Sequence, residues 1–173
     1  MKVRISTIPY EGMAIDSNLP LESLNARVNQ GDSAGIAFTE APTVNLKLHR
    51  THTGAEVKGT LKSKVKQPCS ACDLEITRAI TVPINWILQP ATPEISDDDV
   101  GLLVYTGDHI DLEEPLQEAL ILTLSPFWHP PRKADGSCTQ CDRVCSQVAW
   151  TDKDKSKGTV SLGALLKGAV SKN

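Results

Sequence analysis

The sequence has few aromatic residues and no long hydrophobic run. Phe, Trp and Tyr make up 4% of the 173 residues, so we expect a core built mainly from Val, Ile, Leu and Ala. No apolar stretch approaches the ~18 residues of a membrane-spanning helix, and the N-terminus alternates polar and apolar residues where a secretory signal is continuously apolar. We therefore predict a cytoplasmic protein with no membrane partner.

The sequence also lacks the common catalytic motifs. It contains no HExxH motif, no phosphate-binding glycine loop and no recognisable Ser/His/Asp arrangement. We interpret His49 and His52 as surface residues beside a turn, whereas His129, close to a cysteine pair, is the histidine to test as a metal ligand. The prediction is a protein that is not an enzyme and has no small-molecule substrate.

Five cysteines are present, and four of them form two CxxC pairs, Cys69/Cys72 and Cys138/Cys141. Two thiolates separated by two residues can bind one metal ion from a tight turn, and two such turns complete the tetrahedron that zinc prefers. We predict a structural zinc site made by these four cysteines, with Cys145 as a substitute ligand. The stretch between the pairs exceeds the ~15–20 residues of a compact zinc ribbon. Two alternatives therefore stay open, a redox-active CxxC pair and thiols that never meet.

Charge is unevenly distributed along the chain, although the net charge is only −3. Basic residues dominate between positions 44 and 68, acidic residues between 94 and 118, and basic residues again beyond Arg132. Such segregation indicates either a basic binding face or opposite blocks that neutralise one another in the fold. Four lysines share one face of a predicted strand and are candidates for RNA contact: Lys58, Lys62, Lys64 and Lys66. The alternative is a solvated strand that lysines protect from aggregation.

Residue periodicity predicts an α+β fold, mainly an antiparallel β-sheet. A period of two over residues 44–48 and 57–65 predicts a hairpin that leads into the first CxxC turn. A long strand follows over 74–86, and Pro83 suits an edge or bulge of the sheet. We expect a single domain over residues 1–150 and a basic, flexible tail over 151–173.

Helical spacing of leucines predicts an amphipathic helix over about residues 111–124, with Asp108 or Asp111 as its cap. A second helix is predicted between a capping Asn18 and Gly31, and short strands over residues 1–6 and 100–105. We expect a cysteine-tethered segment to follow the 111–124 helix. These elements complete the predicted α+β domain.

Two parts of the sequence carry a family resemblance: Cys69-Ser70-Ala71-Cys72, and the block from Ile110-Asp111-Leu112 through Glu118 to Pro126. With the basic hairpin before them and the cysteines after them, roughly residues 44–141 resemble the YceD family of bacterial large ribosomal RNA subunit accumulation proteins. The resemblance implies a non-enzymatic factor that supports accumulation of large-subunit ribosomal RNA. Its partner would be that RNA or a large-subunit ribosomal protein.

Two other classes of function remain open. Asp97, Asp98 and Asp99, together with Glu113 and Glu114, could receive a basic ribosomal protein, which describes an assembly chaperone that makes no RNA contact. A thiol-redox protein would instead use a CxxC pair for disulfide exchange.

Overall fold

The computed structural model describes residues 1–31, 35–70, 72–92, 101–140 and 142. The chain divides into two compact units, Met1–Pro130 and Pro131–Asn173, which we describe separately. The predicted domain boundary at residue 150 lies outside the described residues and stays a prediction. In the described part of the chain, no helix combines the length and the apolar character needed to cross a membrane.

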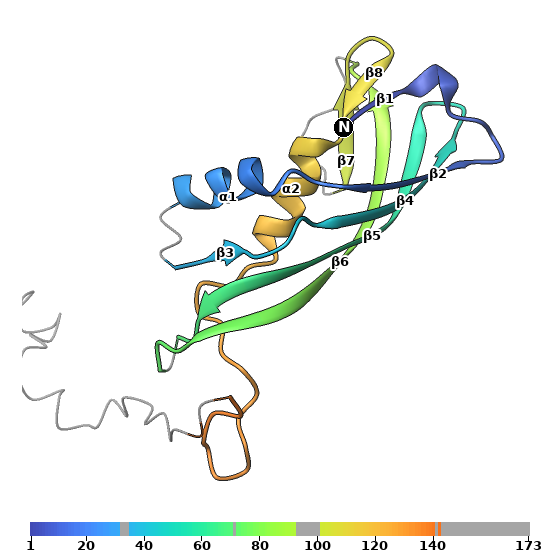
Figure 1. The fold of residues 1–173 in the computed structure, drawn as a ribbon. Coiled ribbons are helices and arrows are strands. Elements are labelled where there is room, and N and C mark those ends of the chain that lie inside the picture. Colours follow the sequence, from blue (N-terminus) through green and yellow to red (C-terminus); the bar gives the residue numbers. More distant parts are fainter. Residues whose placement is uncertain (32–34, 71, 93–100, 141, 143–173) are drawn as a thin grey trace, which may run out of the picture. The chain divides into compact units, whose positions relative to one another are not determined.

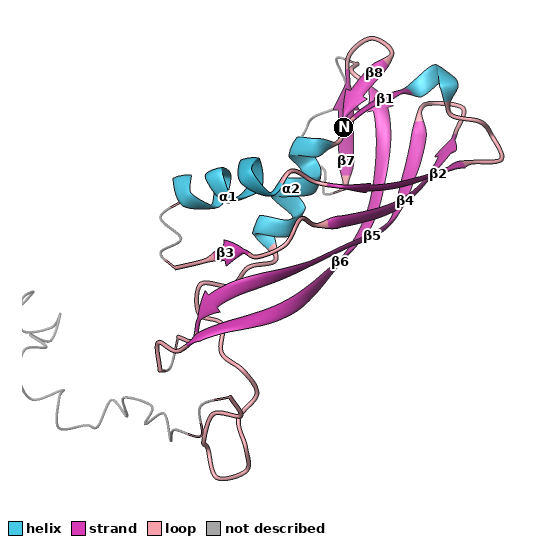
Figure 2. Cartoon of the chain, in the orientation of Figure 1, coloured by secondary structure: helices cyan, strands magenta, loops and turns pink. Residues whose placement is uncertain are grey.

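The first unit is an α+β fold with a mostly antiparallel sheet, as predicted (Figure 1; Figure 2). Its described elements are, in chain order, β1 (Lys2–Arg4), a 3-10 helix (Ile5–Thr7), β2 (Met13–Asn18), α1 (Leu21–Gln30), β3 (Ala37–Phe38), β4 (Thr43–Arg50), β5 (Ala55–Pro68), β6 (Glu75–Pro90), β7 (Leu102–Tyr105), β8 (His109–Asp111) and α2 (Glu113–Leu122).

The main sheet has the strand order β2-β4-β5-β6-β7. β3 pairs with Val65 and Lys66 of β5, in the part of β5 that β4 does not reach. The predicted hairpin is confirmed as β4 and β5, and the predicted long strand is β6, antiparallel to β5. β7 runs parallel to β6 and pairs only with Ile87–Pro90. Among the described residues, Pro83 therefore lies on a stretch of β6 with a neighbour on one side only. A residue without an N–H donor is tolerated there.

The core lies between one face of the sheet and the two helices (Figure 1). Along β4 and β5 the buried side chains alternate with exposed ones, because successive residues of a strand point to opposite faces. The helices contribute fully buried leucines to the same cluster, among them Leu24, Leu116 and Leu120. Gly59 allows β5 to pass close to β4, since a Cβ there would lie 2.0 Å from the Asn45 carbonyl oxygen. We call the opposite, polar face of β4–β6 the outer face.

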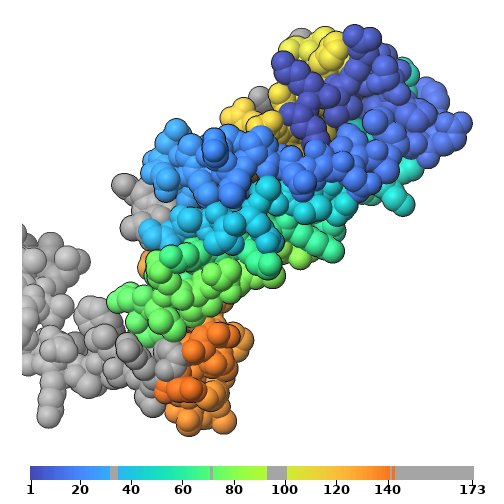
Figure 3. Space-filling view, in the orientation of Figure 1, coloured from blue at the N-terminus to red at the C-terminus, as the bar shows by residue number. Residues whose placement is uncertain are grey.

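Some details differ from the sequence prediction. Asn18 belongs to β2 and does not cap α1, which begins after Pro20 without a side-chain cap. The edge strand β2 was not predicted, because its exposed side chains show no clear alternation. β8 pairs with β1 as a separate two-stranded ribbon, in which dark blue and yellow residues lie side by side (Figure 3). Neither predicted cap of α2 stands at its N-cap, which is Leu112: Asp108 accepts from Ser6, and Asp111 ends β8, although its Oδ1 accepts the Glu113 N–H at 3.1 Å.

Candidate metal centre

The first CxxC turn joins β5 to β6, as the sequence predicted. The Cys69 N–H donates to the Leu74 carbonyl at 2.9 Å, and the Asp73 N–H donates to the Cys69 carbonyl at 2.8 Å. The Cys72 N–H reaches the same carbonyl at 3.3 Å. Asp73 has a φ of 57°, a left-handed conformation that Asp adopts more readily than most residues. These bonds close residues 69–73 into one tight turn.

The second CxxC turn, in the second unit, has the same backbone closure. The Asp142 N–H donates to the Cys138 carbonyl at 3.0 Å, and Asp142 has a φ of 54°. Both turns therefore read Cys-x-x-Cys-Asp, with the aspartate in the left-handed region. The aspartate after each pair can be read from the sequence, and it indicates the left-handed residue that closes each turn. CxxC spacing alone does not reveal it.

The segment that follows α2 holds the first turn in place. Ser70, in the first turn, makes two hydrogen bonds to this segment. Its N–H donates to the Trp128 carbonyl at 3.0 Å, and its hydroxyl donates to the Phe127 carbonyl at 3.2 Å. The Arg78 guanidinium stacks on the Trp128 ring, 4.8 Å from its centroid. The first turn is therefore bonded to residues 127 and 128 as well as to the sheet.

A polar pair, the buried Gln67 and the half-buried Arg78, lies beside this turn. Gln67, only 1% exposed, donates to the Ser125 carbonyl and accepts from the Arg78 Nη2 at 3.3 Å. Burial lowers the pKa of Arg78, and its Nε has no hydrogen-bond partner among the described residues. Because a buried donor without a partner costs free energy, Arg78 depends on its contacts with Gln67 and Trp128.

Side chains of a short loop hold the second turn. Asp135 accepts two hydrogen bonds from Ser137, from the N–H at 2.9 Å and from the hydroxyl at 2.6 Å. These bonds, the hydroxyl's first, hold the pKa of Asp135 below its ordinary value. The Lys133 ammonium pairs with Asp142, which raises the pKa of Lys133. An isolated antiparallel bridge joins Arg132 to Cys138.

Two of the four predicted sulfur ligands come together in the first unit: the Sγ atoms of Cys69 and Cys72 lie within 4.8 Å of each other. Sulfurs around a tetrahedral zinc ion, bound at about 2.3 Å, are roughly 3.8 Å apart, so this grouping fits the ion. Cys69 and Cys138 are buried and Cys72 is half-buried. The predicted ligand Cys141 and its substitute Cys145 lie outside the described residues. Cys69 and Cys72 can thus supply two sulfur ligands to a metal ion.

The structure gives no support to His129 as a further ligand. It is not among the grouped metal-binding side chains of the described residues, and its Nδ1 lies 3.0 Å from the Pro130 carbonyl oxygen. His49 and His52, which were predicted to be surface residues, are both exposed. The candidate metal centre is therefore one of sulfur ligands.

The four predicted RNA-contact lysines all lie on the outer face of β5. Three of them have an acidic partner: Lys58 with Glu56 at 2.7 Å, Lys64 with Glu40 at 3.1 Å and Lys66 with Glu75 at 2.7 Å. The Lys58 ammonium holds the pKa of Glu56 below its ordinary value. Within the described residues, Lys62 has no ion pair. The outer face is thus less positive than the lysine count suggests.

The acidic side of α2 is also largely paired. Glu113 accepts from the Met1 amine at 3.2 Å, and Glu114 pairs with Arg27 at 3.6 Å. A hydrogen bond from the same amine holds the pKa of Asp111 below its ordinary value. The residues Asp97, Asp98 and Asp99 lie outside the described residues.

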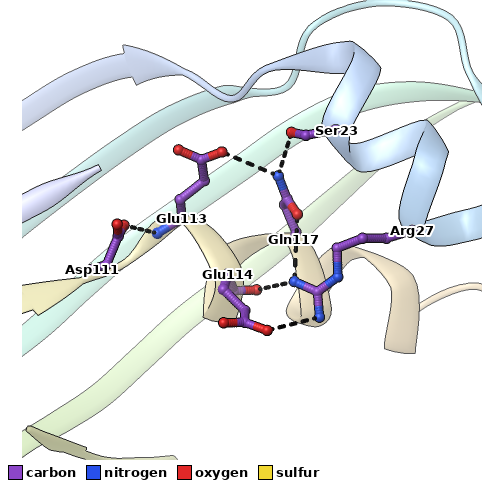
Figure 4. Close-up of a pocket in the computed structure, with 6 residues that line it drawn as sticks. All are labelled: Ser23, Arg27, Asp111, Glu113, Glu114 and Gln117. Atoms are coloured by element: carbon purple, nitrogen blue, oxygen red, sulfur yellow. Dashed lines mark hydrogen bonds and ion pairs between the residues drawn. The ribbon is translucent and has the colours of Figure 1, made fainter.

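A pocket of about 400 Å³ lies between α1 and α2, lined by Ser23, Arg27, Asp111, Glu113, Glu114 and Gln117 (Figure 4). Gln117 is buried and donates to the Ser23 hydroxyl oxygen at 2.8 Å, while Arg27 donates to its Oε1 at 3.4 Å. The Ser23 hydroxyl itself donates to the Pro20 carbonyl. The pocket's lining residues include no base in position to activate this hydroxyl.

Comparison with known proteins identifies no relative of this chain. No protein-family model, no curated protein and no solved structure matches it. The resemblance to the YceD family therefore stays a prediction from the sequence.

Proposed function

We propose that this protein is a non-enzymatic cytoplasmic factor that supports large ribosomal subunit biogenesis and the accumulation of large-subunit ribosomal RNA. The observation that carries the proposal is the outer face of β4–β6, which is exposed, polar and rich in lysines, while the helices cover the other face. A broad polar face suits a macromolecule, whereas small molecules bind in largely apolar concave pockets. The family resemblance supplies the ribosomal context.

A closed four-sulfur zinc site, formed by the two CxxC pairs, would stabilise the fold in this proposal. Thiolates are soft ligands that favour zinc, and a site with four sulfurs leaves no open position for water. The test is metal analysis of freshly purified, reduced protein. We expect about one zinc ion per chain, strong loss in Cys138→Ser and retention in Cys145→Ser. Wild-type protein without bound metal contradicts the zinc site.

A thiol-redox function is less well supported by the geometry. Cys69 is fully buried, and its turn joins two strands, whereas reactive cysteines are partly exposed and often lie at a helix N-terminus. A redox protein requires disulfide exchange that is lost in Cys69→Ser while the fold is kept. We expect no such exchange in the wild type.

RNA contact through the outer face is tested by neutralising its lysines together. The change of Lys58, Lys62, Lys64 and Lys66 to Gln should abolish salt-sensitive binding to transcripts of large-subunit ribosomal RNA, because phosphate contacts release counterions. Circular dichroism of the variant controls for folding. Unchanged binding contradicts this face as the contact.

The protein-partner alternative requires a different outcome. Under it, a basic large-subunit ribosomal protein stays bound after RNase treatment and is lost when Asp97, Asp98, Asp99, Glu113 and Glu114 are neutralised. Because Glu113 and Glu114 already have cationic partners, we expect little loss from those two positions.

A further inference from the structure

The register of the sheet places lysines from two strands beside each other on the outer face. Lys47 of β4 lies directly opposite Lys58 of β5, and Lys62 lies opposite Thr43 of β4. Residues directly opposite in an antiparallel pair have Cβ atoms about 5 Å apart. Lys58 and Lys62 are separated by about 13 Å along β5. These three lysines, which we call the lysine triad, form a triangle across β4 and β5.

Two members of the triad have no acidic partner in the described part of the chain. No carboxylate forms an ion pair with Lys47 or Lys62, and only Lys58 is paired, with Glu56. All three side chains are exposed. Like charges directly opposite each other in a sheet destabilise it. The folded protein therefore carries an electrostatic cost at Lys47 and Lys58 that an incoming anion would relieve.

The polar surroundings of the triad also suit a phosphate backbone. In the register, Lys58 is flanked on β6 by Asn85 and Lys62 by Thr81. Thr60 lies between the lysines on β5, and Asn45, opposite it on β4, donates its amide to the Asp16 Oδ1 at 2.6 Å. Hydroxyl and amide groups of this kind donate to phosphate and sugar oxygens. The patch contains no aromatic side chain on which a base could stack, so it favours backbone contact over base reading.

Lys64 and Lys66, farther along β5, differ from the triad. Each has its own carboxylate, Glu40 for Lys64 and Glu75 for Lys66. In the register their β6 neighbours are Ala79 and Thr77, so neither lysine faces a second cation there. A phosphate that binds at these positions must displace an acidic partner, as it must at Lys58, but it relieves no repulsion between lysines on opposite strands.

We propose that Lys47, Lys58 and Lys62 form the phosphate-contacting site of the outer face, that its ligand is the sugar–phosphate backbone of RNA, and that Lys64 and Lys66 do not contribute. This inference rests on the proposed RNA contact and deepens it. It adds Lys47, which the linear pattern of β5 does not contain, and it removes two lysines that the pattern does contain.

Two double variants with the same change in charge test the assignment in the full-length protein. Binding to a transcript of large-subunit ribosomal RNA is measured over a series of salt concentrations for Lys47→Gln/Lys62→Gln and for Lys64→Gln/Lys66→Gln. Each lost phosphate contact reduces the slope of log affinity against log salt by about one. At 0.1 M salt this corresponds to about a tenfold loss of affinity. We expect a loss of about 100-fold in the first variant and wild-type binding in the second.

The outcomes separate this inference from the proposed function. Equal losses in the two variants, or a loss only in the second, overturn the triad and leave RNA contact standing. Wild-type protein that binds the transcript at no salt concentration overturns both. Polyglutamate that binds as tightly as the RNA and depends equally on Lys47 and Lys62 overturns the choice of RNA as the ligand.

A single substitution gives an independent readout. Lys47→Thr removes the like charge opposite Lys58 and introduces a residue that favours strands. We expect its Tm to rise while its RNA affinity falls about tenfold. A lysine that only solubilises the sheet would leave the affinity unchanged, and that result, or a lowered Tm, overturns the inference.

Discussion

The two Cys-x-x-Cys-Asp turns have the same backbone closure but very different support. The first turn joins strands of 14 and 16 residues, and the register of those strands continues to Pro68 and Glu75 at its edge. The second turn belongs to a short loop with one isolated bridge, between Arg132 and Cys138. One local conformation is thus built in two ways.

The difference predicts which turn would depend more on the proposed metal ion. The long series of backbone pairs between β5 and β6 holds both ends of the first turn without a bound ligand. The second turn relies on hydrogen bonds such as those from Ser137 to the exposed Asp135, which are weakened by competition with water. We therefore expect metal binding to stabilise the second turn far more than the first.

Metal removal should have the largest effect on this comparison. Structural zinc contributes on the order of 10 kcal/mol to folding in zinc-finger peptides. After chelation, we expect the Asp142 amide to lose its protection from hydrogen exchange while the Cys69 and Asp73 amides keep theirs. Hydrogen exchange with and without chelator, followed by mass spectrometry or NMR, measures this difference.

The control for that experiment is Cys145→Ser with its metal bound, which should keep both turns protected. Equal loss of protection in the two turns would show that the sheet does not hold the first one. Loss in neither turn would show that the second forms without a metal ion.

The left-handed aspartates provide a smaller and more local change. Valine is strained at a positive φ by roughly 1–2 kcal/mol, so Asp73→Val should lower the free energy of unfolding of the first unit by about that amount. Asp142→Val should instead weaken metal binding, since its turn lies outside the main sheet. Urea unfolding and a competition assay with a zinc chelator distinguish the two results.

Glycine at the same positions is the matched control, because it adopts a positive φ without strain. Asp73→Gly should remain close to the wild type in stability. Asp142→Gly loses the Lys133 ion pair but keeps the backbone closure, so its metal affinity should exceed that of Asp142→Val. Equal effects of Val and Gly would mean that backbone strain is not the cause.

Much of the main sheet could be predicted from the sequence, because β4, β5 and β6 alternate buried and exposed side chains over long stretches. The helix α2 was also evident, from leucines at helical spacing. β2 and β8 could not be predicted in this way. β2 is a largely exposed edge strand, and β8 has only three residues, so each owes its conformation to a distant partner strand.

The candidate site was predictable in its cysteines but not in its surroundings. CxxC spacing identifies Cys69, Cys72 and Cys138, whereas the contact of Arg78 with Trp128 joins residues 50 positions apart and leaves no periodic signal. The lysine pattern located the correct face of β5. It could not show that Glu40 and Glu75 pair with two of those lysines or that Lys47 lies opposite a third, because both depend on the register between strands.

The smallest effect we expect concerns the pH dependence of the second turn. Asp135 accepts two hydrogen bonds from Ser137, and its pKa in the folded protein lies below the ordinary value of about 3.9. The carboxylate thus stabilises the loop fully above pH ~4, and this contribution is lost as the pH falls through the lowered pKa. An NMR titration of the Ser137 amide measures this transition, and its midpoint should lie below pH ~4. Asp135→Ala should abolish that transition. A midpoint at or above the ordinary value would mean that Asp135 does not hold Ser137. Ser137 precedes Cys138, and Asp135 is the side-chain acceptor for its N–H and hydroxyl in the described part of the loop. The second turn would then lack this support.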